Sequence, residues 1–126
     1  MKADIGTTED VTLLVEKFYE KLMQHDSFKD IFNNMENFSW ETHIPVMVAF
    51  WENILFANNK YQGNPMIKHM QLHQRTTLTS ELFDEWIAIW KETVSENFAG
   101  NNANAAMKRA EQIASVMEYK ILQQNL

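Results

Sequence analysis

The sequence contains no cysteine, which excludes disulfide bonds and metal sites built from thiolates. Only three glycines and two prolines occur in 126 residues, so long helices can form with few interruptions. No apolar run approaches the roughly 20 residues that a membrane-spanning helix needs. The first ten residues lack the apolar stretch of a signal peptide, so a cytoplasmic protein without membrane association is expected.

Charge and composition narrow the class of protein further. A net charge of −6 with singly scattered basic residues argues against a nucleic-acid partner. The length predicts one domain covering residues 1–126. Eight methionines with eight Phe, four Trp and three Tyr are many for this length, and they could fill a core or line a flat apolar pocket. Composition alone leaves both possibilities open.

Apolar residues recur at intervals of three and four, which predicts an all-α protein. A proline is tolerated near a helix start, and Thr42 as cap would place Pro45 at the third helical position. Four long and two short helices favour a bundle or a globin-like packing. The predicted helices run from Thr7 or Thr8 to Gln24, over Phe28–Phe32, from Ser39 to Ala57, from Pro65 to Leu72 after a polar loop at Asn58–Asn64, from a Thr79 cap to Gly100, and from Asn102 to Gln123.

The chain has four histidines that could carry chemistry: His25, His43, His69 and His73. His25 lies among polar residues and is interpreted as a solvated helix-end residue. His69 and His73 are four residues apart, which would place them on one helix face. Zinc needs three or four protein ligands, and no acidic residue lies at a comparable inward position nearby, so a zinc site is disfavoured.

A haem needs fewer protein ligands than a zinc ion, and His69 could supply the one that it needs. One neutral imidazole ligates the iron and apolar side chains enclose the ring. A surface or packing histidine is the alternative that His69 alone leaves open. The residues that could serve such a site around His69 are Met66, Ile67, Met70 and Leu72 as apolar contacts, and Lys68 or Arg75 as partners for a propionate.

Three further residues could face a ligand in such a pocket. Tyr19 follows Phe18 at the edge of an apolar helix face, where a tyrosine either joins the core or points its hydroxyl into a cavity. Trp86 offers an indole N–H that can only donate. His43 near the start of a helix could turn between pocket and solvent. Each of them could also be an ordinary core or surface residue.

Together, five segments resemble the group III truncated haemoglobins over roughly residues 11–117. The most specific segment is the Tyr-x-Gly-x-Pro-x-x-x-His pattern that ends at His69. The scarcity of glycine also fits group III, because groups I and II carry additional glycine pairs. The segments are Phe18-Tyr-Glu-Lys, Ile31-Phe-Asn-Asn, His43-Ile-Pro-Val-Met-Val-Ala-Phe-Trp51, Tyr61-Gln-Gly-Asn-Pro-Met-Ile-Lys-His69, and Phe83-Asp-Glu-Trp86 with Trp90-Lys-Glu-Thr93.

The resemblance implies a shortened two-over-two helical sandwich that holds haem b with His69 as the proximal iron ligand. His73 is the alternative ligand if the register slips, and the spacing from Pro65 favours His69. The resemblance also implies distal hydrogen bonding by Tyr19 and Trp86, with His43 at the distal or gating position. The other pocket positions that it implies are Phe32 (or Phe38), Met47, Phe50 and Trp51.

The implied function is the binding of O2, NO or CO. Donors from Tyr19 and Trp86 would each stabilise a bound ligand by about 1–3 kcal/mol, so slow O2 release is expected. This favours a redox or detoxification role over oxygen transport. The alternative is a haem-dependent NO dioxygenase or peroxidase that uses an external reductase, because the chain has no room for a flavin or NAD module. A cofactor-free helical interaction module is the third hypothesis.

Overall fold

The computed structural model describes residues 2–33, 39–57 and 78–124, with side chains as far as residue 120. All regular secondary structure in these stretches is α-helical, which confirms the predicted fold class. The helices are α1 (Thr8–Leu22), α2 (Asp26–Asn33), α3 (Trp40–Phe56), α5 (Ser80–Asn97) and α6 (Asn101–Gln124). The predictions that lie outside the described residues concern Phe38, the loop at Asn58–Asn64, the helix at Pro65–Leu72, Met66, His69 and His73.

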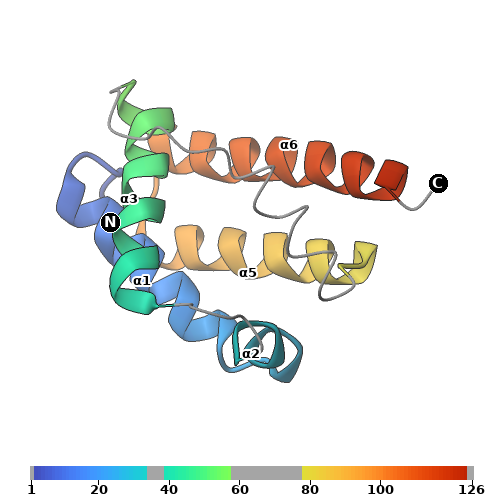
Figure 1. Ribbon diagram of the computed structural model, residues 1–126. Coiled ribbons are helices and arrows are strands. Elements are labelled where there is room, and N and C mark those ends of the chain that lie inside the picture. The colour runs from blue at the N-terminus through green and yellow to red at the C-terminus, as the bar shows by residue number, and fades with distance from the viewer. Residues whose placement is uncertain (1, 34–38, 58–77, 125–126) are drawn as a thin grey trace.

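The four long helices pack as two pairs. Helices α5 and α6 run antiparallel, and α3 crosses them near the turn that joins them (Figure 1). Helix α1 packs against α3 and also against α5, while α3 contacts α6, so the two pairs form two layers. This is the two-over-two sandwich that the sequence predicted.

Helix α1 begins at a capping box. The Thr7 hydroxyl accepts a hydrogen bond from the Asp10 amide at 3.1 Å, and the Asp10 carboxylate accepts one from the Thr7 amide at 3.2 Å. Thr7 is therefore the cap, and the helix ends at Leu22, two residues before the predicted end. The buried face that packs on α3 and α5 consists of Val11, Leu14, Val15, Phe18, Tyr19 and Leu22.

Helix α3 lies within the predicted range Ser39–Ala57, and only the suggestion of Thr42 as its cap is wrong. The N-cap residue is Ser39, and Pro45 lies in the second turn, where it has no N–H for the carbonyl of Glu41. The helix starts at Trp40 because this indole packs against the rings of α1 and α2. Tertiary packing of an apolar side chain outweighs a favourable capping residue here.

The prediction that Gly100 ends α5 is also wrong. Helix α5 starts at the expected Thr79 cap but ends at Asn97, because Phe98 turns to an extended conformation with φ −142° and is buried. Gly100 instead precedes α6, and its carbonyl accepts a hydrogen bond from the Asn104 amide at 2.9 Å. Burial of the Phe98 ring therefore sets the end of α5.

Gly100 permits a close approach of the N-terminal segment to α6. Its φ of +140° favours glycine, and a Cβ there would lie 2.5 Å from Cγ of Asp4. The Asp4 carboxylate accepts hydrogen bonds from the amides of Asn102 at 2.9 Å and Ala103 at 2.8 Å. Burial raises the pKa of Asp4, but the hydrogen bonds from backbone amides have a larger opposite effect. The net pKa of Asp4 therefore lies below the ordinary value. Asp4 thus caps α6 from the other end of the chain.

Trp90 links three helices at the centre of the core. Its indole stacks on Trp51 of α3 with ring centroids 4.5 Å apart, and its N–H donates to the carbonyl of Ala106 in α6 at 3.1 Å. Phe18 of α1 meets the same indole edge-on at 5.0 Å. The helices that carry the candidate site residues are therefore held in place through one side chain.

Candidate functional site

A hydrogen bond joins Tyr19 to His43 across the contact between α1 and α3. The Tyr19 hydroxyl oxygen lies 2.8 Å from Nε2 of His43, and the two rings meet at 72° with centroids 5.0 Å apart. Tyr19 is 9% exposed and His43 is half-buried. The structure therefore brings together two residues that the sequence selected separately.

Burial raises the pKa of Tyr19 far above its ordinary value. The hydroxyl consequently keeps its proton at neutral pH and has one hydrogen to donate. When Nε2 of His43 carries no proton, Tyr19 donates to it. When Nε2 carries a proton, the imidazole donates to the Tyr19 oxygen, and the Tyr19 hydrogen is free for a third group. The protonation state of His43 thus controls the donor capacity of Tyr19.

Two further aromatic rings enclose this pair. Phe32 of α2 lies 6.0 Å from the Tyr19 ring and 6.3 Å from His43. Trp40 of α3 lies 5.1 Å from Tyr19, 5.1 Å from Phe32 and 5.9 Å from His43. The sequence interpretation missed Trp40. Its position three residues before His43 on the same helix was the signal that could have identified it.

Trp86 occupies a different part of the core from the Tyr19–His43 pair. Its ring contacts Phe18 edge-on at 5.6 Å and lies parallel to Trp90 at 6.4 Å. Phe18 in turn contacts Tyr19 at 5.0 Å, so one phenyl ring lies between the two predicted donors. In the described residues, Trp86 is therefore a neighbour of this pair and not a member of it.

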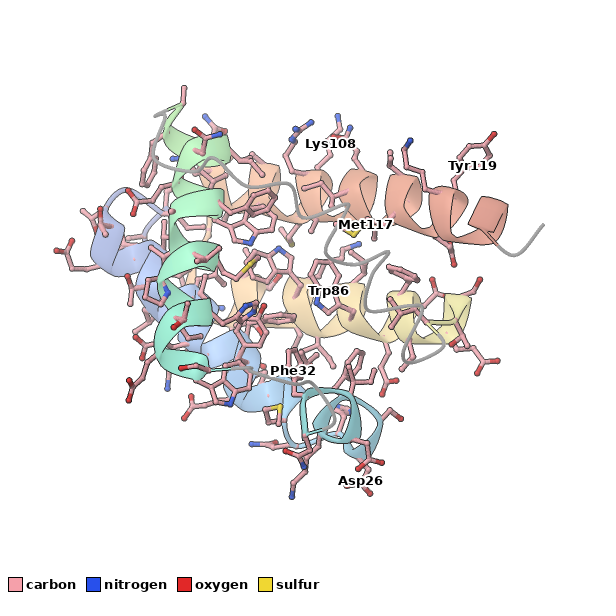
Figure 2. The ribbon with its side chains drawn as sticks, in the orientation of Figure 1. Asp26, Phe32, Trp86, Lys108, Met117 and Tyr119 are labelled. Carbon is pink, nitrogen blue, oxygen red and sulfur yellow. The ribbon has the colours of Figure 1, made fainter. Side chains whose placement is uncertain are left out.

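Half-buried apolar side chains continue from the Tyr19–His43 pair along α3 and α5. Met47 and Phe50 follow His43 by four and seven residues, which places them on one face of α3. Phe32 and Trp86 lie on the same side of α3 in Figure 2, one from α2 and one from α5. The half-buried residues that pack against the core here are Phe32, Met47, Phe50, Leu82, Trp86 and Ile87.

This arrangement fits a haem. A flat macrocycle needs extended apolar contacts, and the half-buried residues supply aromatic and thioether surface on three helices. The Tyr19–His43 pair supplies polar groups beside that surface. His69 and Met66, the predicted ligand and contact on the other face of the ring, lie outside the described residues. The described residues therefore include only the positions that the resemblance assigns to the distal side.

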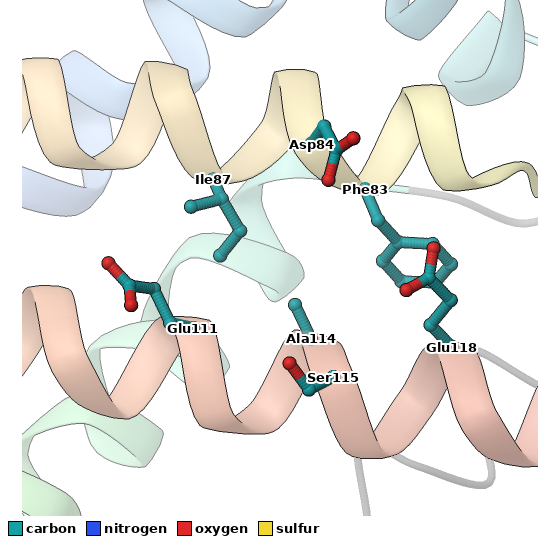
Figure 3. Close-up of a pocket in the computed structure, with 7 residues that line it drawn as sticks. All are labelled: Phe83, Asp84, Ile87, Glu111, Ala114, Ser115 and Glu118. Atoms are coloured by element: carbon teal, nitrogen blue, oxygen red, sulfur yellow. The ribbon is translucent and has the colours of Figure 1, made fainter.

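A hollow lies between α5 and α6, and none of its lining residues belongs to the Tyr19–His43 pair. Figure 3 shows its lining side chains between α5 and α6. Its volume is about 260 Å³, and Glu118 Oε1 is buried there with no hydrogen-bond partner among the described residues. Its lining is too acidic for the propionates of a haem: Phe83, Asp84, Ile87, Glu111, Ala114, Ser115 and Glu118.

The described residues show neither a metal cluster nor a membrane span. No three His, Asp or Glu side chains among them lie where they could hold a metal ion together. No helix in the described stretches is long and apolar enough to cross a membrane.

His25 is exposed, as expected, and its Nδ1 pairs with Glu85 at 3.1 Å.

Comparisons with known proteins identify the family of this chain. The chain matches the family model of bacterial-like globins over residues 3–119. It is 30% identical to a group 3 truncated hemoglobin of Campylobacter jejuni over 118 residues, covering 91% of each chain. The crystal structure of group III truncated hemoglobin from Campylobacter jejuni has a TM-score of 0.84 at 28% identity, covering 96% of this chain and 95% of that one. These matches show that the chain belongs to the group III truncated haemoglobins of the bacterial-like globin family.

Proposed function

We propose that this chain binds haem b through His69 and holds O2, NO or CO beside Tyr19 and His43. Membership of the globin family implies a haem cofactor and a diatomic ligand. The observation that supports the finer assignment is the 2.8 Å hydrogen bond between Tyr19 and His43, next to half-buried apolar side chains of α2, α3 and α5. A pair of polar groups, one buried and one half-buried, beside apolar surface is suited to a small polar ligand.

Each described residue has a separate task in this proposal. Haem, when bound, would supply an iron that can take a diatomic ligand. Met47 and Phe50 of α3, with Phe32 of α2, contact the ring and exclude water from it. In this proposal Met66 contacts the ring on the side of His69.

Tyr19 and Trp86 are the proposed donors to the ligand. A buried hydroxyl that stays protonated and an indole N–H can each donate one hydrogen. Hydrogen bonds to a ligand that carries partial charge contribute about 1–3 kcal/mol each, and each 1.4 kcal/mol slows release about tenfold. Slow O2 release makes the chain a poor oxygen carrier and favours a redox or detoxification role.

His43 favours an enzymatic alternative, a NO dioxygenase or peroxidase served by an external reductase. Its imidazole can hold a proton and lies in direct hydrogen-bond contact with Tyr19, so a proton can be passed toward the ligand. With a reductase added, stopped-flow mixing of the oxygenated protein with NO should give repeated turnover. A reaction that stops after one turnover would overturn the enzymatic alternative and leave ligand binding intact.

The haem assignment predicts a specific absorption spectrum. The protein loaded with haemin should show a strong Soret band in the ferric and ferrous states, and the band of the ferrous state should shift when CO is added. His69→Ala should weaken or abolish this band, because the iron loses its protein ligand. His73→Ala is the matched control, since it removes the other imidazole of the same segment and should leave the spectrum unchanged.

Two results would contradict the proposal in different ways. A folded protein that takes up no haemin would refute haem binding altogether. A spectrum that changes in His73→Ala and persists in His69→Ala would keep the haem and reassign its ligand. Far-ultraviolet circular dichroism of each variant separates loss of the ligand from loss of the helices.

A further inference from the structure

We propose that Trp40 is a positioning residue that holds the His43 imidazole against the Tyr19 hydroxyl. This inference rests on the proposed function, because it concerns how the distal pair is kept ready for a ligand. Trp40 contacts both members of the pair, Tyr19 and His43. Its effect on ligand release is therefore expected to pass through His43.

The first argument is the position of Trp40 between three helices. It is the first residue of α3, and its indole packs at 5.1 Å against Tyr19 of α1 and at 5.1 Å against Phe32 of α2. Both neighbours belong to packed helices, since Tyr19 is buried and Phe32 packs against the core. The indole consequently has a defined place from which it can restrain a neighbouring ring.

The second argument is what the indole restrains. The His43 ring is half-buried and can rotate about two side-chain bonds, and water can compete for its nitrogens at that exposure. Tyr19, Trp40 and Phe32 contact it with centroid distances of 5.0, 5.9 and 6.3 Å. Trp40 is the only one of these three on the same helix as His43, so it moves together with the His43 backbone.

The third argument is the weak start of α3. The side chain of its N-cap residue, Ser39, makes no capping hydrogen bond, and Pro45 removes one amide donor from the second turn. The backbone amides of Thr42 and His43 still bond to the Ser39 carbonyl at 3.2 and 2.9 Å. With few local restraints, the contacts of the Trp40 ring determine where the first turn lies, and with it the base of the His43 side chain.

The pair is sensitive to small displacements. The Tyr19 hydroxyl has one hydrogen, and its partner is either His43 or the ligand. If the imidazole turns away from Tyr19, the hydroxyl behaves as if His43 were absent. Removal of the indole is therefore expected to reproduce the effect of His43→Leu on the ligand.

The test uses Trp40→Leu, with Trp40→Phe as the conservative variant that keeps an aromatic ring. In the diamagnetic CO-bound protein, NMR of wild type should show a slowly exchanging Tyr19 hydroxyl proton together with a hydrogen-bonded Nε2 signal of His43. Trp40→Leu should lose both signals, and Trp40→Phe should retain them. If Trp40→Leu does not fold, Trp40→Met removes the ring while keeping a flexible apolar side chain.

The kinetic readout separates positioning from general loosening of the fold. O2 dissociation is measured in Trp40→Leu, His43→Leu and the double variant. Trp40→Leu should change the rate in the same direction as His43→Leu, and the double variant should match His43→Leu within about twofold, the ordinary scatter of additive effects. A purely structural role would change the rate by the same factor with and without His43.

The outcomes distinguish failure of this inference from failure of the haem proposal. If wild type takes up no haemin, the proposed function fails, and the same NMR signals are read on the protein as purified. If haem binds but both signals persist in Trp40→Leu, only the role of Trp40 is refuted. The role of Trp40 would also be refuted if Trp40→Leu changed the O2 dissociation rate by the same factor in wild type and in His43→Leu.

Discussion

Replacement of Tyr19 by phenylalanine is expected to raise the rate of O2 dissociation from the ferrous protein about tenfold to a hundredfold. The substitution removes one hydroxyl and keeps the ring that packs between Phe18, Phe32 and Trp40. The helices should therefore stay in place while the proposed donor is lost. Stopped-flow displacement of O2 by CO measures the rate directly.

The chain offers a matched control for this experiment. Tyr119→Phe makes the same chemical change at a side chain that is 63% exposed on α6, and its rate should equal that of wild type. An unchanged rate in Tyr19→Phe would show that the hydroxyl remains with His43 when a ligand is bound. In that case Trp86 would be left as the donor in the proposal, and Trp86→Phe would be the next variant to measure.

Trp90→Ala is expected to have the largest effect on stability, a loss of about 3–5 kcal/mol in the free energy of unfolding. Trp90 is 1% exposed, and its removal opens a cavity between α1, α3 and α5. Domains of this size are stable by about 5–15 kcal/mol, so much of the total would be lost. Denaturant unfolding followed by circular dichroism gives the value.

Two further variants separate the contributions of the Trp90 ring. Trp90→Phe keeps an aromatic ring but loses the hydrogen bond to the Ala106 carbonyl, and it should cost less than Trp90→Ala. Tyr119→Ala removes an exposed aromatic ring and should change stability by no more than about 0.5 kcal/mol. Equal losses in Trp90→Ala and Tyr119→Ala would contradict the central position of Trp90 in the core.

The consequence of Trp90→Ala should extend to the proposed haem site. Trp86 lies parallel to Trp90 at 6.4 Å, and Trp51, which contacts Phe50, stacks on Trp90 at 4.5 Å. Both Trp86 and Phe50 are predicted pocket residues. Faster transfer of haemin to an acceptor protein is therefore expected in the same variant. Stability and cofactor retention would then be coupled through one side chain.

Helix positions were largely predictable from the sequence because their signals are local. The apolar intervals in α1 and α5 and the caps Thr7 and Thr79 determine those helix starts within one turn of chain. The errors occurred where distant contacts outweighed local ones. Helix α3 starts at Trp40 and not after the suggested Thr42 cap, and Phe98 ends α5 before Gly100.

The predicted site divides in a similar way. The resemblance selected Tyr19, Phe32 and His43 by their order along the chain, and the structure places these three in one cluster. It could not show that Tyr19 and His43 hydrogen-bond to each other, since that depends on how α1 packs against α3. Trp86 was assigned the same task as Tyr19, yet Phe18 separates the two rings. The assignment of His69 and Met66 remains a prediction.

The sequence by itself determined the fold class, the helix periodicity and the family resemblance, because these depend on residue types and on their spacing along the chain. The tertiary structure alone decided the hydrogen bond between Tyr19 and His43, the position of Trp40 beside them, and the capping of α6 by the Asp4 carboxylate. Residues 4 and 102 are brought together by packing, as are residues 19 and 43. Contacts between residues far apart in the chain depend on the angles at which helices cross, and no local pattern encodes those angles.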